Sequence, residues 1–229
     1  MLAFAMAFRG QRPGKVLSRR PASGRPSERS AMARAYGAAG GSLTTNESRG
    51  KFGKAGFHGH EGEVQTARLL AAAFRGDPDV LLFHDLRVPE RGDGRPERGN
   101  GQIDHIIVRG HRIIVLDSKR WRAGRIVTVP FLGTFRGWRR FRPADKHTVG
   151  MAVDRLSCYL PPGCRVRGAL LVQVAGKGKL DLRFYRPRDG VTAISADNLA
   201  PLKTMLGGPA RSDPAVSAAI HSLLIRPAA

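Results

Sequence analysis

Residues 102–119 read QIDHIIVRGHRIIVLDSK, two runs of β-branched and aliphatic residues on either side of Gly110-His111. Such runs are typical of β-strands, and Gly110 supplies the positive φ that a two-residue hairpin loop requires. If Gly110-His111 forms the loop, Asp104 on the first strand lies opposite Asp117 on the second. A three-residue loop would shift the pairing by one position and separate the two acids.

Charged groups gather at the open end of this hairpin. Side chains alternate between the faces of a strand, so Lys119 shares the face of Asp117. Two neighbouring carboxylates repel each other, and a hard cation such as Mg²⁺, which binds one or two carboxylates plus phosphate, offsets that cost. The pattern predicts a metal site at Asp104 and Asp117. The alternative is a solvated strand end with a loose Asp117–Lys119 ion pair.

Helical and strand patterns flank the hairpin. Apolar residues repeat at helical spacing over 63–74 and 148–160, and Ser195 and Asp213-Pro214 are typical helix starts. Further strands are expected over 80–88, 126–135, 167–174 and 180–185. This order predicts an α/β fold with a central mixed sheet flanked by helices.

Composition divides the chain into three parts. Residues 1–55 hold eleven basic residues and two acids among Gly, Ser, Pro and Ala, and we expect a disordered tail there. This tail is either a basic arm that touches phosphates or an extension that precedes a start at Met32. Residues 56–190 form the expected domain, and residues 191–229 form a C-terminal helical annex.

The net charge is +21, from 39 basic and 18 acidic residues, and a polyanion such as nucleic acid is the natural partner. Only eight of the 39 are lysine, so part of the arginine excess reflects a compositional bias. The two cysteines lack zinc-ligand spacing, and no apolar run has the length of a membrane span. We therefore expect a cytoplasmic protein with no membrane partner.

The segment 119–142 combines cations with aromatic residues and contains no acid. Its basic residues are Lys119, Arg120, Arg122, Arg125, Arg136, Arg139, Arg140 and Arg142. Its aromatic residues are Trp121, Phe131, Phe135, Trp138 and Phe141. Cations hold phosphates, and aromatic rings either stack on bases or fill the core beneath. The segment is predicted to bind substrate without reading sequence; a plain solvated basic face is the alternative.

Several motifs together resemble the nuclease-related domain, NERD, over roughly residues 56–174. The matching residues are Gly59, Gly62, Glu63, Gln102, Asp104, His105, Asp117, Lys119 and Gly124. NERD is grouped with the PD-(D/E)XK, restriction-endonuclease-like fold, which implies a mixed sheet between helices and a Mg²⁺-dependent phosphodiesterase site, with Mn²⁺ as an alternative ion. The chain departs from the pattern at Ile103, where proline is usual, and at Asp117, where glutamate is commoner.

The resemblance implies a role for each site residue. Asp104, Asp117 and the Ser118 carbonyl would bind the metal, and Lys119 would orient or deprotonate the attacking water and offset transition-state charge. Glu63, expected in the first turn of its helix, would bind a second metal or a bound water, unless it merely complements the helix dipole.

The neighbouring polar residues have more than one reading. Gln102 either positions substrate or water, or is a polar residue of the strand that only packs against its neighbours. His105 points away from Asp104 and is interpreted as structural, while His58 and His60 are expected as solvated loop residues.

Three functions follow as hypotheses. The first is a Mg²⁺-dependent nuclease acting on nucleic acid, with DNA as the favoured substrate. The second is a non-catalytic nucleic-acid-binding module that retains the nuclease fold. The third is a protein-interaction domain whose charge only reflects composition. The sequence leaves open DNA versus RNA, endo- versus exonuclease action and oligomeric state.

Overall fold

The computed structural model describes residues 33–41, 46–90 and 101–225, with the backbone alone for residues 46–58. Most of the predicted basic tail, residues 1–32, lies outside the described residues. The elements in chain order are β1 (Arg34–Tyr36), α1 (Asn46–Ala73), β2 (Leu81–Arg87), β3 (Gln102–Arg109), β4 (Arg112–Val129), β5 (Gly133–Arg136), β6 (Arg139–Arg140), the short 3₁₀ helix η2 (Arg142–Asp145), α2 (Thr148–Tyr159), β7 (Arg165–Phe184), β8 (Thr192–Ser195), α3 (Ala200–Leu206) and α4 (Pro214–His221).

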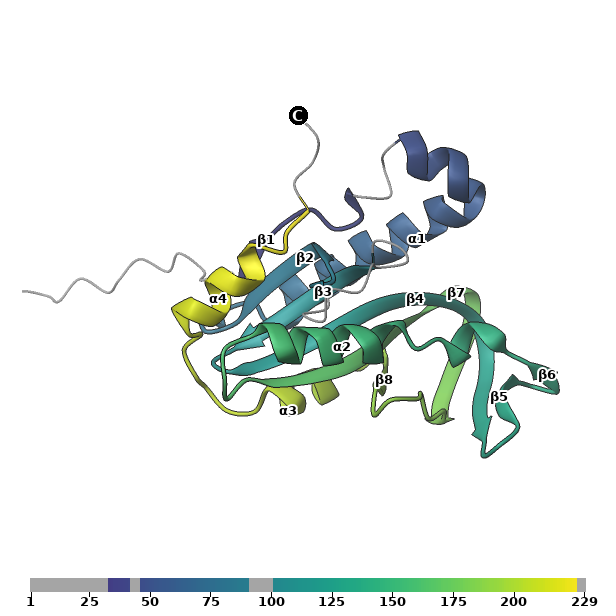
Figure 1. Ribbon diagram of the computed structural model, residues 1–229. Coiled ribbons are helices and arrows are strands. Elements are labelled where there is room, and N and C mark those ends of the chain that lie inside the picture. The colour runs from purple at the N-terminus through teal and green to yellow at the C-terminus, as the bar shows by residue number, and fades with distance from the viewer. Residues whose placement is uncertain (1–32, 42–45, 91–100, 226–229) are drawn as a thin grey trace, which may run out of the picture.

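The described strands build one eight-stranded mixed sheet (Figure 1). Strands β1 to β6 are neighbours in chain order, β7 pairs with β4, and β8 pairs with β7. The β2–β3–β4 ladders are antiparallel, whereas β1–β2, β4–β7 and β7–β8 are parallel. The predicted mixed sheet flanked by helices is therefore confirmed, and the arrangement is consistent with a restriction-endonuclease-like fold.

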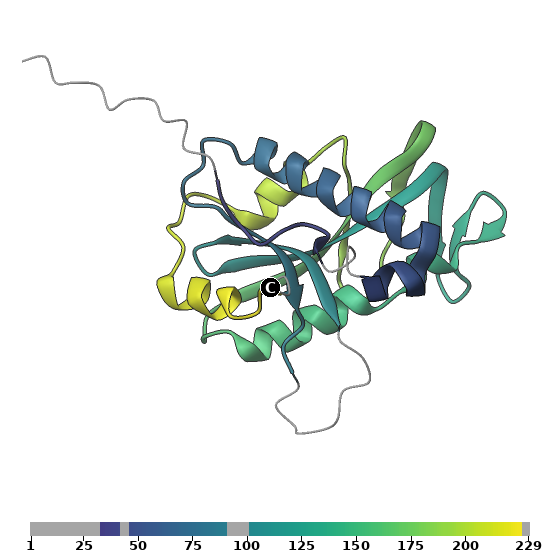
Figure 2. The same ribbon diagram turned by 90° about the horizontal axis from the view of Figure 1, so that it is seen from above.

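Helices cover both faces of the sheet. Figure 2 shows α1 and α3 on one side and α2 and α4 on the other. On the α2 face, Val149 and Leu156 of α2 and Ile220 of α4 join one apolar cluster. Leu70 of α1 and Leu202 of α3 join the second cluster, on the opposite face. Each fully buried aliphatic side chain of this kind contributes roughly 1.5–3 kcal/mol, so the strands between the helices are held from both sides.

The β3–β4 hairpin has the predicted register. Arg109 pairs with Arg112 across a two-residue loop, and the ladder continues to His105 and Leu116. Gly110 has a φ of 57°, the left-handed conformation that the loop was expected to need. Extending this register by one position places Asp104 opposite Asp117.

Several boundaries differ from the expectation. Strand β1, inside the predicted tail, pairs in parallel with β2 and therefore belongs to the sheet. Helix α1 begins at Asn46, so Glu63 lies well inside the helix and not in its first turn. The glycines at 53, 56, 59 and 62 had hidden this helix, because glycine weakens helical propensity and interrupts apolar periodicity.

The C-terminal segment holds one confirmed and one misplaced helix start. Asp213 caps α4 as predicted, since its side chain accepts a hydrogen bond from the Ala215 N–H at 2.7 Å. Helix α3, however, begins at Ala200, because Ser195 is still the last residue of strand β8.

The second halves of β4 and β7 continue past the helices and, with β5 and β6, project from the body of the molecule (Figure 1). We call this projection, residues 122–142 and 175–184, the arm. Its base is fixed by Trp121, only 5% exposed, whose ring contacts Phe141 and Tyr185 edge-on at centroid distances of 5.0 and 5.5 Å. The Tyr185 hydroxyl donates to the Ala144 carbonyl at 2.9 Å, so the base of the arm is a packed unit.

Candidate active site

Two neighbouring strands carry the predicted acids. Asp104 of β3 and Asp117 of β4 line the same small hollow, whose other wall is the first turn of α2 with Thr148 and Val149. Both acids are partly buried. The predicted convergence of the two acids on one face of the hairpin is therefore present in the structure.

Each acid has one well-defined polar contact. Asp104 Oδ2 accepts a hydrogen bond from the Ser118 backbone N–H at 2.7 Å. Asp117 Oδ2 forms an ion pair with Lys119 Nζ, and the two side chains are 18% and 24% exposed. The amide contact fixes one carboxylate to the neighbouring strand, and the ammonium group lies directly against the other.

The charges of these groups act on one another. Burial, followed by repulsion from Asp117 and Glu63, holds the pKa of Asp104 well above its usual value. Burial would lower the pKa of Lys119, but attraction to Asp117 and Asp104 outweighs it and raises that pKa. The site thus contains a lysine that stays charged and an acid that ionises at a cost.

Glu63 reaches this cluster from α1. Burial, then repulsion from Asp85 and Asp117, raises the pKa of Glu63 to about 7, while Lys119 and a hydrogen bond from the Gly40 backbone oppose the rise. Because Glu63 lies inside α1 and not in its first turn, a favourable interaction with the helix dipole does not explain why an acid occupies this position.

Asp85 is the residue that the sequence interpretation missed. It lies in β2, is 5% exposed, and has a φ of 58°. The β2–β3 ladder skips it between the His84–His105 and Leu86–Ile103 pairs. Aspartate adopts the left-handed region more readily than most residues, but a positive φ is uncommon for any residue other than glycine, and such conformations concentrate at functional sites. The signal in the sequence was a single acid inside the apolar strand LLFHDLR.

The donor set fits a hard cation. Among the described residues, no three His, Cys, Asp or Glu side chains are arranged as a ready-made metal cage. Mg²⁺ does not need one, because it is held by one or two carboxylates with water and substrate phosphate completing its shell. Asp104 and Asp117 supply such a pair, and a cation between them would relieve the repulsion that raises the pKa of Asp104.

A buried polar chain backs the site on the α1 face. Nδ1 of His84 and Nδ1 of His105 are 2.8 Å apart, and His105 Nε2 lies 3.0 Å from Ser118 Oγ. Ser118 Oγ donates to Thr66 Oγ1 at 2.9 Å, and Gln173 Nε2 donates to the same oxygen at 2.6 Å. His105 therefore faces away from Asp104 and makes structural contacts, as predicted.

This hydrogen-bonded network ties helix α1 to four strands, β2, β3, β4 and β7. Gln173 of β7 also donates to the Gly62 carbonyl at 2.8 Å, directly before Glu63. Burial lowers the pKa of His84 to about 4, and burial together with His84 holds the pKa of His105 well below its usual value. Two neutral rings can share one hydrogen bond, which two imidazolium ions could not. His60, expected in a solvated loop, lies in α1 instead, with Nδ1 3.1 Å from the Gly40 carbonyl oxygen.

Three of the six arginines predicted to bind substrate are already paired with carboxylates. The N–O distances are 2.6 Å for Arg120–Glu61, 3.0 Å for Arg125–Asp181 and 3.6 Å for Arg140–Asp145. A paired arginine still attracts phosphate, but its partner offsets part of its charge.

The other predicted contacts are more available. Arg136 lies over the Phe141 ring, 4.7 Å from its centroid. Arg122 and Arg139 are exposed and form no ion pair with any residue that the structure describes. Gln102 is exposed beside the hollow that contains Asp104 and Asp117. Its role in positioning substrate or water stays a prediction.

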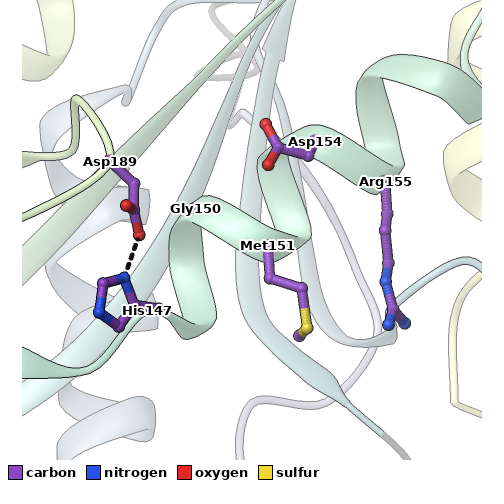
Figure 3. Close-up of a pocket in the computed structure, with 6 residues that line it drawn as sticks. All are labelled: His147, Gly150, Met151, Asp154, Arg155 and Asp189. Carbon is purple, nitrogen blue, oxygen red and sulfur yellow. Dashed lines mark hydrogen bonds and ion pairs between the residues drawn. The ribbon is translucent and has the colours of Figure 1, made fainter.

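A larger cavity of about 540 Å³ lies along α2 and contains none of the predicted site residues. Figure 3 shows His147 paired with Asp189 at its edge, at 2.8 Å, while Met151, Asp154 and Arg155 project from the helix. The His147–Asp189 pair is exposed and none of the candidate site residues lines this cavity, so we place the candidate active site at the β3–β4 hairpin.

Fold and site together define an α/β protein with a restriction-endonuclease-like sheet and an acid–acid–lysine cluster at the end of its central hairpin. Residues 58–151 match the family described as nuclease-related domain, NERD, and the matched segment includes Glu63, Asp104, Asp117 and Lys119. No match to a curated protein or to a solved structure was found. Among the described residues, no helix combines the length and apolar character needed to span a bilayer.

Proposed function

We propose that this protein is a Mg²⁺-dependent nuclease that hydrolyses phosphodiester bonds, with DNA as its substrate. The observation that supports this most directly is the convergence of Asp104, Asp117 and Lys119 at one end of the β3–β4 hairpin. The NERD match over residues 58–151 supports a nuclease-related function independently.

Each residue of the candidate site would have a distinct role in hydrolysis. Asp104 and Asp117 would hold Mg²⁺, or Mn²⁺ in its place, with the Ser118 carbonyl as a further ligand; the bound ion would supply charge to stabilise the transition state. Lys119 keeps its proton at neutral pH, because its pKa is raised, so it orients the attacking water and offsets phosphate charge. Glu63, which interacts with Asp117 and Lys119 from helix α1, is suited to hold that water.

One observation favours a second function. Lys119 already neutralises Asp117 through their ion pair, so the site is partly compensated without a metal. A binding module that lost catalysis while keeping the fold would also have such a pair. In that case the exposed arginines of the arm would be the functional groups.

Cleavage assays separate the two functions. Plasmid DNA, single-stranded DNA and RNA would each be incubated with the full chain and Mg²⁺, Mn²⁺ or EDTA. We expect metal-dependent cleavage by the wild type and none by Asp117→Ala, whose DNA binding stays within about twofold. Asp197→Ala is the matched control, because Asp197 is an exposed acid outside the cluster.

Absence of cutting by the wild type with either metal, or equal cutting by Asp117→Ala, would exclude the nuclease proposal. Retained, salt-sensitive DNA binding in that event would support the binding module. The same assay shows whether DNA or RNA is cleaved faster.

A further inference from the structure

Two fully exposed aromatic side chains stand out on the arm. Phe131 has a relative exposure of 107% and Trp138 of 101%. By contrast, Phe141 of the arm packs against Trp121 at the base of the arm. The Phe131 and Trp138 rings are thus presented to solvent, where they contribute nothing to the core of the arm.

Each exposed ring occupies the turn of a hairpin. The β5–β6 pairing of Arg136 with Arg139 leaves Gly137 and Trp138 as a two-residue loop, and Gly137 has the positive φ of such a turn. Phe131 lies in the β4–β5 loop with a φ of 64°, a strained conformation for an aromatic residue. The loops thus hold both rings outward on short, defined turns.

Cations surround these turns. From residue 122 to residue 142 the chain has six arginines and no acid. Arg136 and Arg139 flank the Trp138 turn directly, and Arg139 forms no ion pair with a described residue. A ring between guanidinium groups matches a ligand in which flat apolar groups alternate with negative charges.

We propose that the arm binds a single-stranded segment of nucleic acid, with Trp138 and Phe131 stacking on unpaired bases and Arg136 and Arg139 holding the adjacent phosphates. Bases inside a duplex stack on one another, so a protruding ring reaches them only where the strands are separated. The inference rests on the proposed nucleic-acid substrate and narrows it to one with unpaired nucleotides.

The arm is continuous with the candidate active site. Strand β4 carries Asp117 and Lys119 and then runs into the arm as far as Val129. At about 3.3 Å per residue, the distal end of β4 lies roughly 30 Å along the strand from Lys119. A nucleic acid held by the arm can therefore extend to the acids, with its single-stranded part on the arm side of the cut.

The two tryptophans make the test specific. Trp121 is buried and Trp138 is exposed, and the chain has no other tryptophan. Quenching of intrinsic fluorescence by bound bases therefore reports on Trp138. Titrations in EDTA, which prevent cleavage, would use a single-stranded oligonucleotide, a blunt duplex of the same sequence, and anionic phospholipid vesicles.

We expect the single strand to quench the wild type and to bind Trp138→Ala about tenfold more weakly, with Phe131→Ala similar. Trp138→Phe should retain most of the affinity and lose the quenching. Blunt-duplex binding should change less than twofold in every variant. Tyr159→Ala, an exposed aromatic residue on α2 outside the arm, is the matched control and should bind like the wild type.

Equal losses for single strand and duplex, or no loss for Trp138→Ala, would overturn the proposal, as would quenching by vesicles without quenching by DNA. Because these measurements need no cleavage, selective single-strand binding by a catalytically silent protein would support the arm while excluding the nuclease. Cleavage by the wild type, together with unchanged single-strand binding by Trp138→Ala, would support the nuclease and exclude the role of the arm.

Discussion

Asp104 Oδ2 accepts a hydrogen bond from the Ser118 backbone N–H at 2.7 Å, across the two central strands. The contact orients one carboxylate of the candidate site without neutralising it. Repulsion from Asp117 and Glu63 acts on the same group, and together with burial it raises the pKa of Asp104. The backbone thus orients this carboxylate, at an electrostatic cost that a bound cation would remove.

Asp104→Asn should therefore separate stability from metal binding. Asparagine keeps an oxygen that can accept from Ser118 and removes one acid from the cluster, so the metal-free protein should gain on the order of 1 kcal/mol in unfolding free energy. The wild type should gain about 2.7 kcal/mol when Mg²⁺ is present at a hundred times its Kd, and the variant should gain almost nothing. Thermal unfolding with and without Mg²⁺ measures both; a Mg²⁺ response retained by Asp104→Asn would show that the ion binds elsewhere.

Glu63 should give the metal-free protein a distinct pH dependence. Its pKa rises from 4.5 to about 7 on folding, so the folded state binds more protons between these values. This contribution favours folding below pH 4.5 and is lost progressively as the pH rises toward about 7, at a cost of roughly 3 kcal/mol. The unfolding free energy of Glu63→Gln should fall less over this range, as measured by urea denaturation at several pH values. If the unfolding free energies of wild type and variant changed equally with pH, Glu63 would not have the raised pKa that its burial implies.

The hairpin and its acids could be predicted because local rules suffice for them. Gly110 fixed the loop, the loop fixed the register, and strand alternation then put Asp104 and Asp117 on one face. The separation of His105 from that face followed from the same alternation. None of these steps required knowledge of distant contacts.

Asp85 and the start of α1 depended on tertiary context. Asp85 belongs to the cluster through the β2–β3 pairing and a left-handed backbone, neither of which its own strand pattern encodes. Glycines masked the first half of α1, and three-residue β1 is too short to show a period. Which aromatic residues of the arm fill the core also depended on packing, since Trp121 and Trp138 have similar arginine-rich neighbours in the sequence.

The buried polar chain behind the site should be important for stability. Thr66 Oγ1 accepts from both Ser118 and Gln173, and Thr66 is fully buried. Thr66→Val removes this acceptor and leaves two donors unsatisfied, so it should lower the unfolding free energy by about 1–3 kcal/mol. Thr66→Ser keeps the hydroxyl and should cost less than Thr66→Val. Urea denaturation measures both unfolding free energies. A larger decrease for Thr66→Ser than for Thr66→Val would mean that the threonine methyl group, not the hydrogen bonds, provides the stability.

The salt dependence of DNA binding should identify which arginines touch phosphate. Arg122 and Arg139 are exposed without an ion pair to a described residue, so each should neutralise one phosphate of bound DNA. Replacing either with glutamine should reduce the slope of log K against log salt concentration by about 1, since each phosphate contact releases condensed counterions.

Arg75→Gln is the matched control for this series. Arg75 is exposed just beyond α1 and lies outside the arm. The salt-dependence slope of Arg75→Gln should therefore equal that of the wild type. Arg125, paired with Asp181, should have a smaller effect than Arg122, because its charge is already partly offset. Equal reductions in all four variants would mean that DNA responds only to net charge, and the arm would then have no special part in binding.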